Sequence, residues 1–421
     1  MRILILSTFD TFGGAAIAAT RLNKALVKSG VKSTLLVQDK KSKELYVEGI
    51  TSNWFQKKLA LFRFVFDRLQ FIFFEKSKAY RFQFSQGTIG VDIHNHPLVQ
   101  DADVIHLHWI NFGFLSVNSI KKIIDLKKPV VITMHDMWYF TGGCHYSKDC
   151  TNYLHECGNC EPFLKNPTLE DLSHQGWLQK KSLFKNTQIT FVACSEWLAA
   201  KARTSSLLNG ADILAIPNPI NANVFINSDK KEAQDFFKLS QDKKYVLFAA
   251  MKVSDERKGF VYFKQALNIL KSMLLMDQNT IELLIFGQED TSDFESIPFK
   301  VNSLGRLTDV TTIAKAYAAA HVFVIPSIED NLPNTVMESL SCGTPVVGFN
   351  TGGIPEMIEH KKTGYIATRK SPNDLAKGMY WTLFQSEYEK LCLRCREKVL
   401  SDYTENIVVN KYVQVYNTYL K

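Results

Sequence analysis

Two α/β domains, each built on a doubly wound parallel sheet, are the fold that the sequence predicts. The chain has 421 residues, a length that suggests two or three domains at about 150 residues each. In each half, short apolar runs typical of strands alternate with amphipathic runs typical of helices, which favours parallel sheets. The alternation stops at Pro217-Asn218-Pro219 and then restarts, so this segment is predicted to join two domains.

The predicted boundaries follow from this alternation. Residues 1–216 form the first domain, with a cysteine-rich insert at 144–160, and residues 217–400 form the second. Residues 401–421 are predicted to form a C-terminal helix that crosses back to the first domain. The clearest expected strands are 3–7, 34–37, 104–107 and 130–133 in the first domain, and 245–249, 281–286, 322–325 and 346–349 in the second.

Composition narrows the class of protein. The apolar fraction is 46%, ample for a buried core in each domain. The first apolar run, residues 3–6, is too short for a membrane span or a signal sequence, so we expect a first strand there. The net charge of +8 suits anionic ligands, but no nucleic-acid motif is present and no nucleic-acid partner is expected. Eight cysteines are too few for a disulfide scaffold of this length, which favours the reducing cytoplasm.

The most informative stretch is residues 304–347. A buried strand is expected to end at Pro326-Ser327, and a new helix is expected to begin near Asn334 or Thr335 after a polar loop. Ligands of open α/β sheets bind where loops leave the carboxyl ends of strands, and the backbone N–H groups of a helix start suit a diphosphate. The spacing from Thr335 to Glu338 fits a capping box, so spacing alone favours helix capping by Glu338 over ligand binding.

This stretch resembles the retaining glycosyltransferases of family 4, which have the GT-B fold: two Rossmann-like domains that face a cleft. The resemblance rests on the Gly-Arg at 305–306, the strand ending in Pro-Ser, two acids eight residues apart, and the motifs at 343–347, 351–356 and 363–365. It implies that Glu338 binds the ribose of a nucleotide and that the helix start at Asn334 and Thr335 binds the diphosphate. It also implies backbone contacts to the base near Gly305 and Leu307.

Two parts of the donor site depart from the family pattern. Asp330 stands eight residues before Glu338, where the family usually has Glu, and its neighbour Glu329 is an alternative partner for the sugar hydroxyls. The family's Lys-Gly is matched by Lys258-Gly259, but its preceding Gly-Arg is absent, so Lys252 or Arg257 would supply the second cation. Such cations would stabilise the departing diphosphate. The alternative is a solvated surface loop.

In the amino half, Gly13-Gly14 follows the first strand and resembles the family's glycine loop, which lets backbone approach an anionic ligand. Two strands are followed by histidines, His108 and His135. His135 matches a family position beside the sugar and diphosphate, whereas a structural role for His108 is equally open. Ser195 also matches a family position, with helix capping as the alternative.

The resemblance implies a front-face retaining transfer, without a catalytic metal, from a nucleoside diphosphate sugar to a hydroxyl of a glycan or lipid-linked acceptor. We therefore expect a hexosyltransferase-like enzyme of surface polysaccharide biosynthesis. A GT-B nucleotide-sugar epimerase is one alternative, and a non-catalytic membrane-associated scaffold is another.

A cysteine cluster stands apart from these motifs. Cys144, Cys150, Cys157 and Cys160 lie within seventeen residues, and four thiolates at such spacing suit a tetrahedral structural zinc. Two disulfides or free thiols are the alternatives.

An aromatic and basic helix is expected over residues 54–74. Its apolar residues at helical spacing are Phe55, Leu59, Phe62, Phe66, Leu69 and Phe73, and lysines and arginines are interspersed. The charges exclude a membrane span. Peripheral contact with an anionic membrane, at the inner face of the cell membrane, is one interpretation, and a core helix packed on the first domain is the other.

Overall fold

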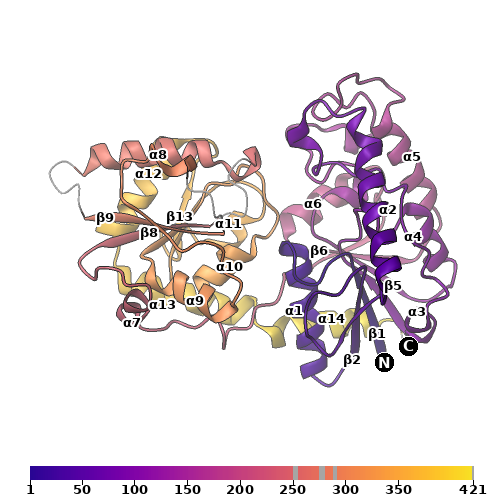
Figure 1. Ribbon diagram of the computed structural model, residues 1–421, viewed down its shortest axis with the longest axis horizontal. Helices are drawn as coiled ribbons and strands as arrows, with labels where there is room; N and C mark the ends of the chain where they lie inside the picture. Colours follow the sequence, from indigo (N-terminus) through magenta and orange to yellow (C-terminus); the bar gives the residue numbers. More distant parts are fainter. Residues whose placement is uncertain (250–254, 275–279, 288–291, 420–421) are drawn as a thin grey trace. The chain divides into compact units, whose positions relative to one another are not determined.

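The computed structural model describes residues 1–249, 255–274, 280–287 and 292–419 (Figure 1). The chain divides into two compact units. The first unit comprises Met1–Pro219 and Val408–Lys421, and the second comprises Ile220–Ile407. Each is described separately below.

The first unit contains a seven-stranded sheet whose strand pairs are all parallel, in the order β3-β2-β1-β4-β5-β6-β7. The strands are β1 (Arg2–Ser7), β2 (Lys32–Val37), β3 (Val47–Gly49), β4 (Val104–Leu107), β5 (Val130–Met134), β6 (Ile189–Ala193) and β7 (Asp212–Ala215). The order reverses between β1 and β4, and such a switch point is where α/β sheets bind ligands.

Helices cover both faces of this sheet. They are α1 (Gly14–Lys28), α2 (Trp54–Ile72), α3 (Pro97–Asp101), α4 (Val117–Ile124), α5 (Leu172–Phe184), α6 (Glu196–Thr204) and α14 (Glu405–Asn417). Alternate residues of β1 enter two cores, because side chains of a strand point to opposite faces. Ile3 and Ile5 pack in the core that contains α1 and α14, whereas Leu4 and Leu6 pack in the core that contains α4 and α6.

The second unit contains a six-stranded parallel sheet in the order β10-β9-β8-β11-β12-β13. The strands are β8 (Lys244–Ala249), β9 (Ile281–Phe286), β10 (Val301–Ser303), β11 (Val322–Ile325), β12 (Val346–Phe349) and β13 (Gly364–Ala367). Its helices are α7 (Lys230–Phe236), α8 (Phe260–Met273), α9 (Val310–Ala319), α10 (Asn334–Ser341), α11 (Ile354–Met357), α12 (Pro372–Tyr380) and α13 (Tyr388–Asp402). The switch point lies between β8 and β11.

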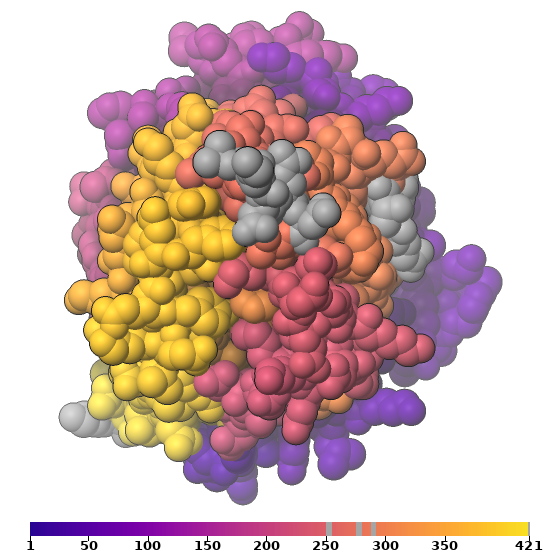
Figure 2. Space-filling view, turned by 90° about the vertical axis from the view of Figure 1, so that its left-hand side faces the viewer, coloured from indigo at the N-terminus to yellow at the C-terminus, as the bar shows by residue number. Residues whose placement is uncertain are grey.

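One side of the second unit is built from its C-terminal helices. Figure 2 shows these residues, in yellow, beside the rose-coloured segment that opens the unit. Arg396 of α13 joins the two, because its guanidinium donates to the carbonyls of Phe225 at 2.6 Å and Ala222 at 2.7 Å. The six strands of the second sheet follow the same order as the first six strands of the first sheet, which confirms the predicted pair of Rossmann-like α/β domains.

The C-terminal helix differs from the prediction of one helix over 401–421. The chain leaves the helical path after Asp402, and α14 begins only at Glu405. Val408, Tyr412 and Tyr416 of α14 are fully buried in the core of the first unit. Among the described helices, none is both long and apolar enough to cross a membrane.

Candidate functional site

The carboxyl end of β11 carries a loop that is fixed by the turn before α8. Gly259 has φ of 67°, and a Cβ there would lie 1.9 Å from the carbonyl oxygen of Pro326, so only glycine permits this approach. Two further bonds hold the loop: Ile328 N–H donates to the carbonyl of Arg257 at 2.8 Å, and Arg257 Nη1 donates to the carbonyl of Glu329 at 2.9 Å. The residues after β8 and β11 therefore meet at the switch point of the second sheet.

Asp330 is the centre of this meeting. Lys258 Nζ donates to its Oδ2 at 2.7 Å, and Arg257 Nη1 lies 3.3 Å from the same oxygen. Ser327 Oγ also donates to Oδ2, at 3.3 Å. The side chain of Asp330 is buried, whereas that of Lys258 is one-third exposed. Two cations and an acid that the sequence motifs predicted thus lie together, with Lys258 and Arg257 both in contact with the buried carboxylate of Asp330.

The charges of this cluster depend on one another. Burial alone would raise the pKa of Asp330, but the neighbouring Lys258 and Arg257 lower it to about 2. Burial and the adjacent Arg257 lower the pKa of Lys258, and Asp330 partly offsets that effect. At neutral pH the carboxylate is therefore ionised, and it is a poor base.

The backbone of Asp330 is held from the other side by the loop after β12. Gly352 has φ of 60°, and a Cβ there would lie 1.7 Å from the carbonyl oxygen of Asp330. Gly353 N–H donates to that same oxygen at 3.1 Å. Arg369, a residue that the sequence motifs did not single out, donates through Nε to the carbonyl of Ile328 at 3.0 Å. The family-like glycines therefore position the acid.

The capping box expected from Thr335 to Glu338 is not formed, because helix α10 begins before Thr335. Helix α10 begins at Asn334 after Pro333, and no side chain caps it. Thr335 lies inside the first turn instead of at the cap position. Glu338 is buried, and its Oε2 accepts a hydrogen bond from the hydroxyl of Tyr317 at 3.2 Å. Tyr317 lies on α9, and no local pattern in the sequence indicated this contact.

Two further residues of the predicted donor site, Gly305 and Leu307, are not among the described residues that contact Asp330. Gly305 follows β10 with φ of 63°, and its carbonyl accepts from Gly287 N–H at 2.9 Å, which fixes the turn before Leu307. Leu307 is half-buried. Lys252 lies outside the described residues.

In the first unit, the two histidines predicted from the strand ends contact each other, His108 buried and His135 half-buried. His108 follows β4 and His135 follows β5, and His108 Nδ1 lies 2.9 Å from His135 Nε2. Burial lowers the pKa of His135 to about 4, and burial together with neighbouring imidazoles lowers the pKa of His108 well below its usual value. Both rings are neutral at pH 7. His108 Nε2 is buried and has no hydrogen-bond partner among the described residues.

Two other predicted positions have clear local roles. Gly13 is the N-cap of α1 with φ of 87°, and Gly14 is the first residue of that helix, directly after the loop from β1. Ser195 caps α6, because its Oγ accepts from Leu198 N–H at 3.1 Å. The capping interpretation of Ser195 is therefore confirmed.

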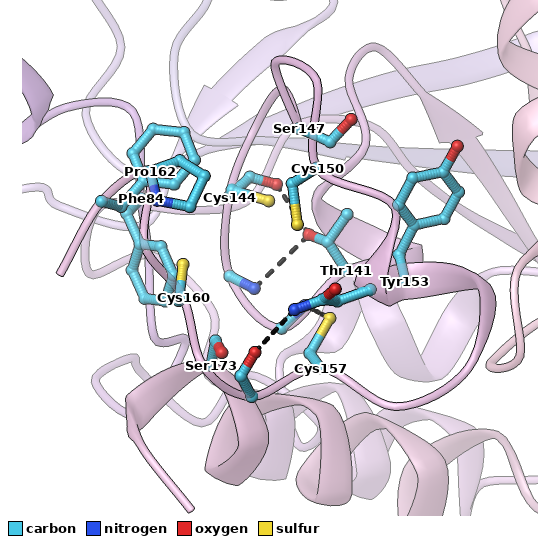
Figure 3. Close-up of a pocket in the computed structure, with 15 residues that line it drawn as sticks. Phe84, Thr141, Cys144, Ser147, Cys150, Tyr153, Cys157, Cys160, Pro162 and Ser173 are labelled. Atoms are coloured by element: carbon cyan, nitrogen blue, oxygen red, sulfur yellow. Dashed lines mark hydrogen bonds between the residues drawn. The ribbon is translucent and has the colours of Figure 1, made fainter. Parts of the chain in front are cut away.

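The four clustered cysteines line one small pocket, together with aromatic residues such as Phe84 and Tyr153 (Figure 3). All four are free thiols, so the alternative of two disulfides is not formed. Gly142 N–H donates to Cys157 Sγ at 3.2 Å. Throughout the described ranges, however, no three His, Cys, Asp or Glu side chains are arranged to hold a metal ion. Zinc binding would require these thiols to turn toward one another, so the zinc site stays a prediction.

Metal analysis of chelator-free protein checks this prediction. About one zinc per chain is expected if the four thiols close on a metal, and Cys150→Ser should lower that content. Cys342→Ser, a buried cysteine of the second unit, is the matched control and should leave it unchanged. Less than about half an equivalent of zinc in the wild type contradicts the prediction.

Comparisons with known proteins agree with this fold. The family model described as "Glycosyltransferase Family 4" matches residues 12–224, half of the chain, and the model described as "Glycosyl transferases group 1" matches residues 243–384. The chain therefore belongs to glycosyltransferase family 4 and is a glycosyltransferase of the GT-B type.

Three proteins illustrate the likeness. An uncharacterized glycosyltransferase of Methanocaldococcus jannaschii is 25% identical over 362 residues, which cover 79% of this chain and 84% of that protein. The putative colanic acid biosynthesis glycosyl transferase WcaC of Escherichia coli is 24% identical over 331 residues, which cover 76% of each protein. Anabaena HepE, solved in complex with UDP-glucose, has a TM-score of 0.64 at 13% identity, over 99% of this chain and 100% of that one.

Proposed function

We propose that this glycosyltransferase is a retaining enzyme that moves a sugar from a nucleoside diphosphate sugar to a hydroxyl of a glycan or lipid-linked acceptor. The observation that carries the proposal is the convergence of Lys258, Arg257 and Asp330 at the switch point of the second sheet. Cleavage of the donor leaves negative charge on a diphosphate, and fixed cations stabilise that charge.

Each residue of the cluster has a distinct role in this proposal. Lys258 and Arg257 hold the diphosphate, together with the N–H groups of Asn334 and Thr335 at the start of α10. Glu338 accepts hydrogen bonds from the ribose hydroxyls. Asp330, rather than Glu329, contacts the sugar hydroxyls, because Lys258 and Arg257 both orient its carboxylate.

The electrostatics of Asp330 favour retention by a front-face route. With a pKa of about 2, the carboxylate is a poor base for the acceptor hydroxyl. The departing diphosphate is itself an oxyanion on the same face of the sugar and is better suited to accept that proton. In the first unit, His108 Nε2 is the ring nitrogen of this pair without a partner among the described residues, and it offers one N–H donor to a substrate hydroxyl when His135 Nε2 donates to His108 Nδ1.

Two relatives narrow the expected substrates. HepE was solved with UDP-glucose, which favours a UDP-hexose as the first donor to test. WcaC carries the description of a colanic acid biosynthesis enzyme, which favours a surface polysaccharide as the product.

Donor turnover tests the proposal against its two alternatives. A transferase releases nucleoside diphosphate only when acceptor is present, and the anomeric configuration of the product reports retention directly. An epimerase interconverts nucleotide sugars without acceptor, and a scaffold turns over neither. Inversion at the anomeric carbon would overturn the retaining mechanism and leave the transferase class intact.

A further inference from the structure

Helix α2 of the first unit exposes most of its apolar residues to solvent, and it buries only Ala60, Asp67, Arg68 and Phe71. It runs from Trp54 to Ile72 in front of the sheet in the view of Figure 1, and Asn53 caps it by accepting from Gln56 N–H at 2.9 Å. The predicted apolar stripe is therefore real, but it does not pack on the first domain.

The inward side of α2 is held by a buried ion pair. Asp67 and Arg68 are 3% and 4% exposed and bind each other directly. Arg68 also donates to the carbonyls of Arg81 at 2.7 Å and Phe84 at 2.8 Å, and to Ser85 Oγ at 3.1 Å. This network fixes the orientation of the helix. Rotating the helix about its axis would break the hydrogen bonds of Arg68 and leave those carbonyls without their donor.

The outward side carries a large aromatic surface, which we call the α2 face. Trp54 is 72% exposed, Phe55 70% and Phe62 62%, and Phe73, directly after the helix, is 63% exposed. Leu59, Val65, Phe66 and Leu69 complete the face, each at least 40% exposed. Contiguous exposed apolar surface of this kind marks an interaction site, because leaving it in water is costly.

The exposed charges on the segment that carries the α2 face are basic, although Lys57 Nζ also lies 3.9 Å from Asp39 of another segment. Lys57 and Lys58 lie near the start of the helix, Lys76 and Lys78 lie beyond its end, and all four are exposed. Within residues 52–82 the sequence has two acids, Asp67 and Glu75. Both are neutralised: Asp67 by Arg68, and the almost fully buried Glu75 by Arg81 at 2.5 Å. The segment therefore presents aromatic rings and lysines together.

This combination selects the occupant. Aromatic and aliphatic side chains flanked by lysines suit the interface of an anionic bilayer, where rings enter the headgroup region and ammonium groups meet phosphates. A second copy fits less well, because a two-fold contact through the α2 face would bring its lysines close to those of the partner copy.

We propose that the α2 face docks the enzyme onto an anionic lipid bilayer through its aromatic side chains. This inference deepens the proposed function, since a membrane-bound enzyme meets lipid-linked or membrane-assembled acceptors at that surface. Binding to lipid needs neither donor nor catalysis, so it can be tested separately from transfer.

Co-sedimentation with vesicles tests the proposal on the full chain. At low salt, the wild type should bind vesicles of phosphatidylglycerol and phosphatidylcholine, and bind pure phosphatidylcholine far less. The double variant Trp54→Ser/Phe62→Ser should lower the partition coefficient about tenfold or more, since two large apolar side chains are lost. Lys58→Gln/Lys78→Gln should weaken binding and reduce its salt dependence.

The matched control is Phe236→Ser/Leu393→Ser, which removes two exposed apolar side chains from the second unit, 52% and 59% exposed. It should bind vesicles as the wild type does. All variants should keep the wild-type melting temperature and turnover with a water-soluble acceptor, because the changed side chains face solvent.

Three outcomes overturn the docking proposal. The first is a folded wild type that does not bind anionic vesicles at low salt. The second is a Trp54→Ser/Phe62→Ser variant that binds as tightly as the wild type. The third is a stable dimer, seen by analytical ultracentrifugation, that this variant dissolves while vesicle binding is absent. A wild-type protein that binds vesicles but transfers no sugar would instead count against the proposed function and leave the docking proposal standing.

Discussion

Replacement of Lys258 by alanine is expected to lower kcat for sugar transfer by about 100- to 1000-fold, the cost typical of removing one fixed group that stabilises a developing oxyanion. The ammonium group lies 2.7 Å from Asp330 and is one-third exposed, so it can reach both the carboxylate and an incoming diphosphate. The measurement is nucleoside diphosphate release at saturating donor and acceptor.

Two variants control this experiment. Lys264→Ala removes a lysine of the adjoining helix α8 and should leave turnover unchanged. Lys258→Arg keeps the charge and should retain part of the activity. The fold of Lys258→Ala should persist, because Arg257 still lies 3.3 Å from the buried carboxylate of Asp330. Near-wild-type turnover of a folded Lys258→Ala protein contradicts the proposed diphosphate site.

Replacement of Glu338 by alanine is expected to lower kcat/KM for the donor by about 100-fold or more. A hydrogen bond to a charged group contributes about 1.5–3 kcal/mol, and the ribose offers two hydroxyls to this carboxylate. Steady-state kinetics with varied donor check the result, and the stabilisation of the protein by nucleoside diphosphate in thermal melts should fall in parallel.

Tyr317→Phe is the matched control for Glu338→Ala. It removes the hydroxyl that donates to Glu338 at 3.2 Å but leaves the carboxylate in place. If Glu338 binds ribose, Tyr317→Phe should stay within a few-fold of wild type. If Glu338 only supports the packing of α9 on α10, both variants should lose stability together and donor affinity should be spared. That second outcome contradicts the assignment.

The fold could be predicted from the sequence because its signals are local. The strands expected over residues 104–107, 281–286 and 346–349 begin and end at those residues. Each is a short apolar run that is followed by a polar residue or glycine. Alternation of the two kinds of element then specified parallel sheets.

The candidate site was only partly predictable, because its contacts join distant parts of the chain. Sequence motifs identified both Lys258 and Asp330. Their ion pair joins residues 72 positions apart, however, and no local sequence pattern predicts such a pair. Spacing to Thr335 alone favours capping by Glu338, whereas the structure has Tyr317, on a different helix, donating to its carboxylate. Short-range spacing cannot decide between a local and a tertiary partner.

Helix α2 illustrates a different limit. Periodicity identified the apolar stripe correctly, but periodicity does not say which side of a helix is buried. The buried pair of Asp67 and Arg68 decides the orientation, and its stabilisation comes from carbonyls at Arg81 and Phe84. An ion pair of adjacent residues in a sequence is usually expected to be solvated, so this orientation emerged only from the structure.

The return of α14 to the first unit has a consequence for how the protein can be made. Thr133 Oγ1 of β5 lies 2.7 Å from His106 Nε2 and 2.9 Å from the hydroxyl of Tyr412, and Tyr416 contacts the other nitrogen of His106 at 2.8 Å. On a ribosome, these tyrosines are synthesised only after residues 220–407. The first unit therefore cannot complete its fold until the whole second unit has been translated, because His106 and Thr133 lack their tyrosine partners until then. An expression fragment that ends at Pro219 would lack α14. The apolar core residues and the two polar side chains that α14 covers would then be exposed to solvent, and the fragment would be prone to aggregate.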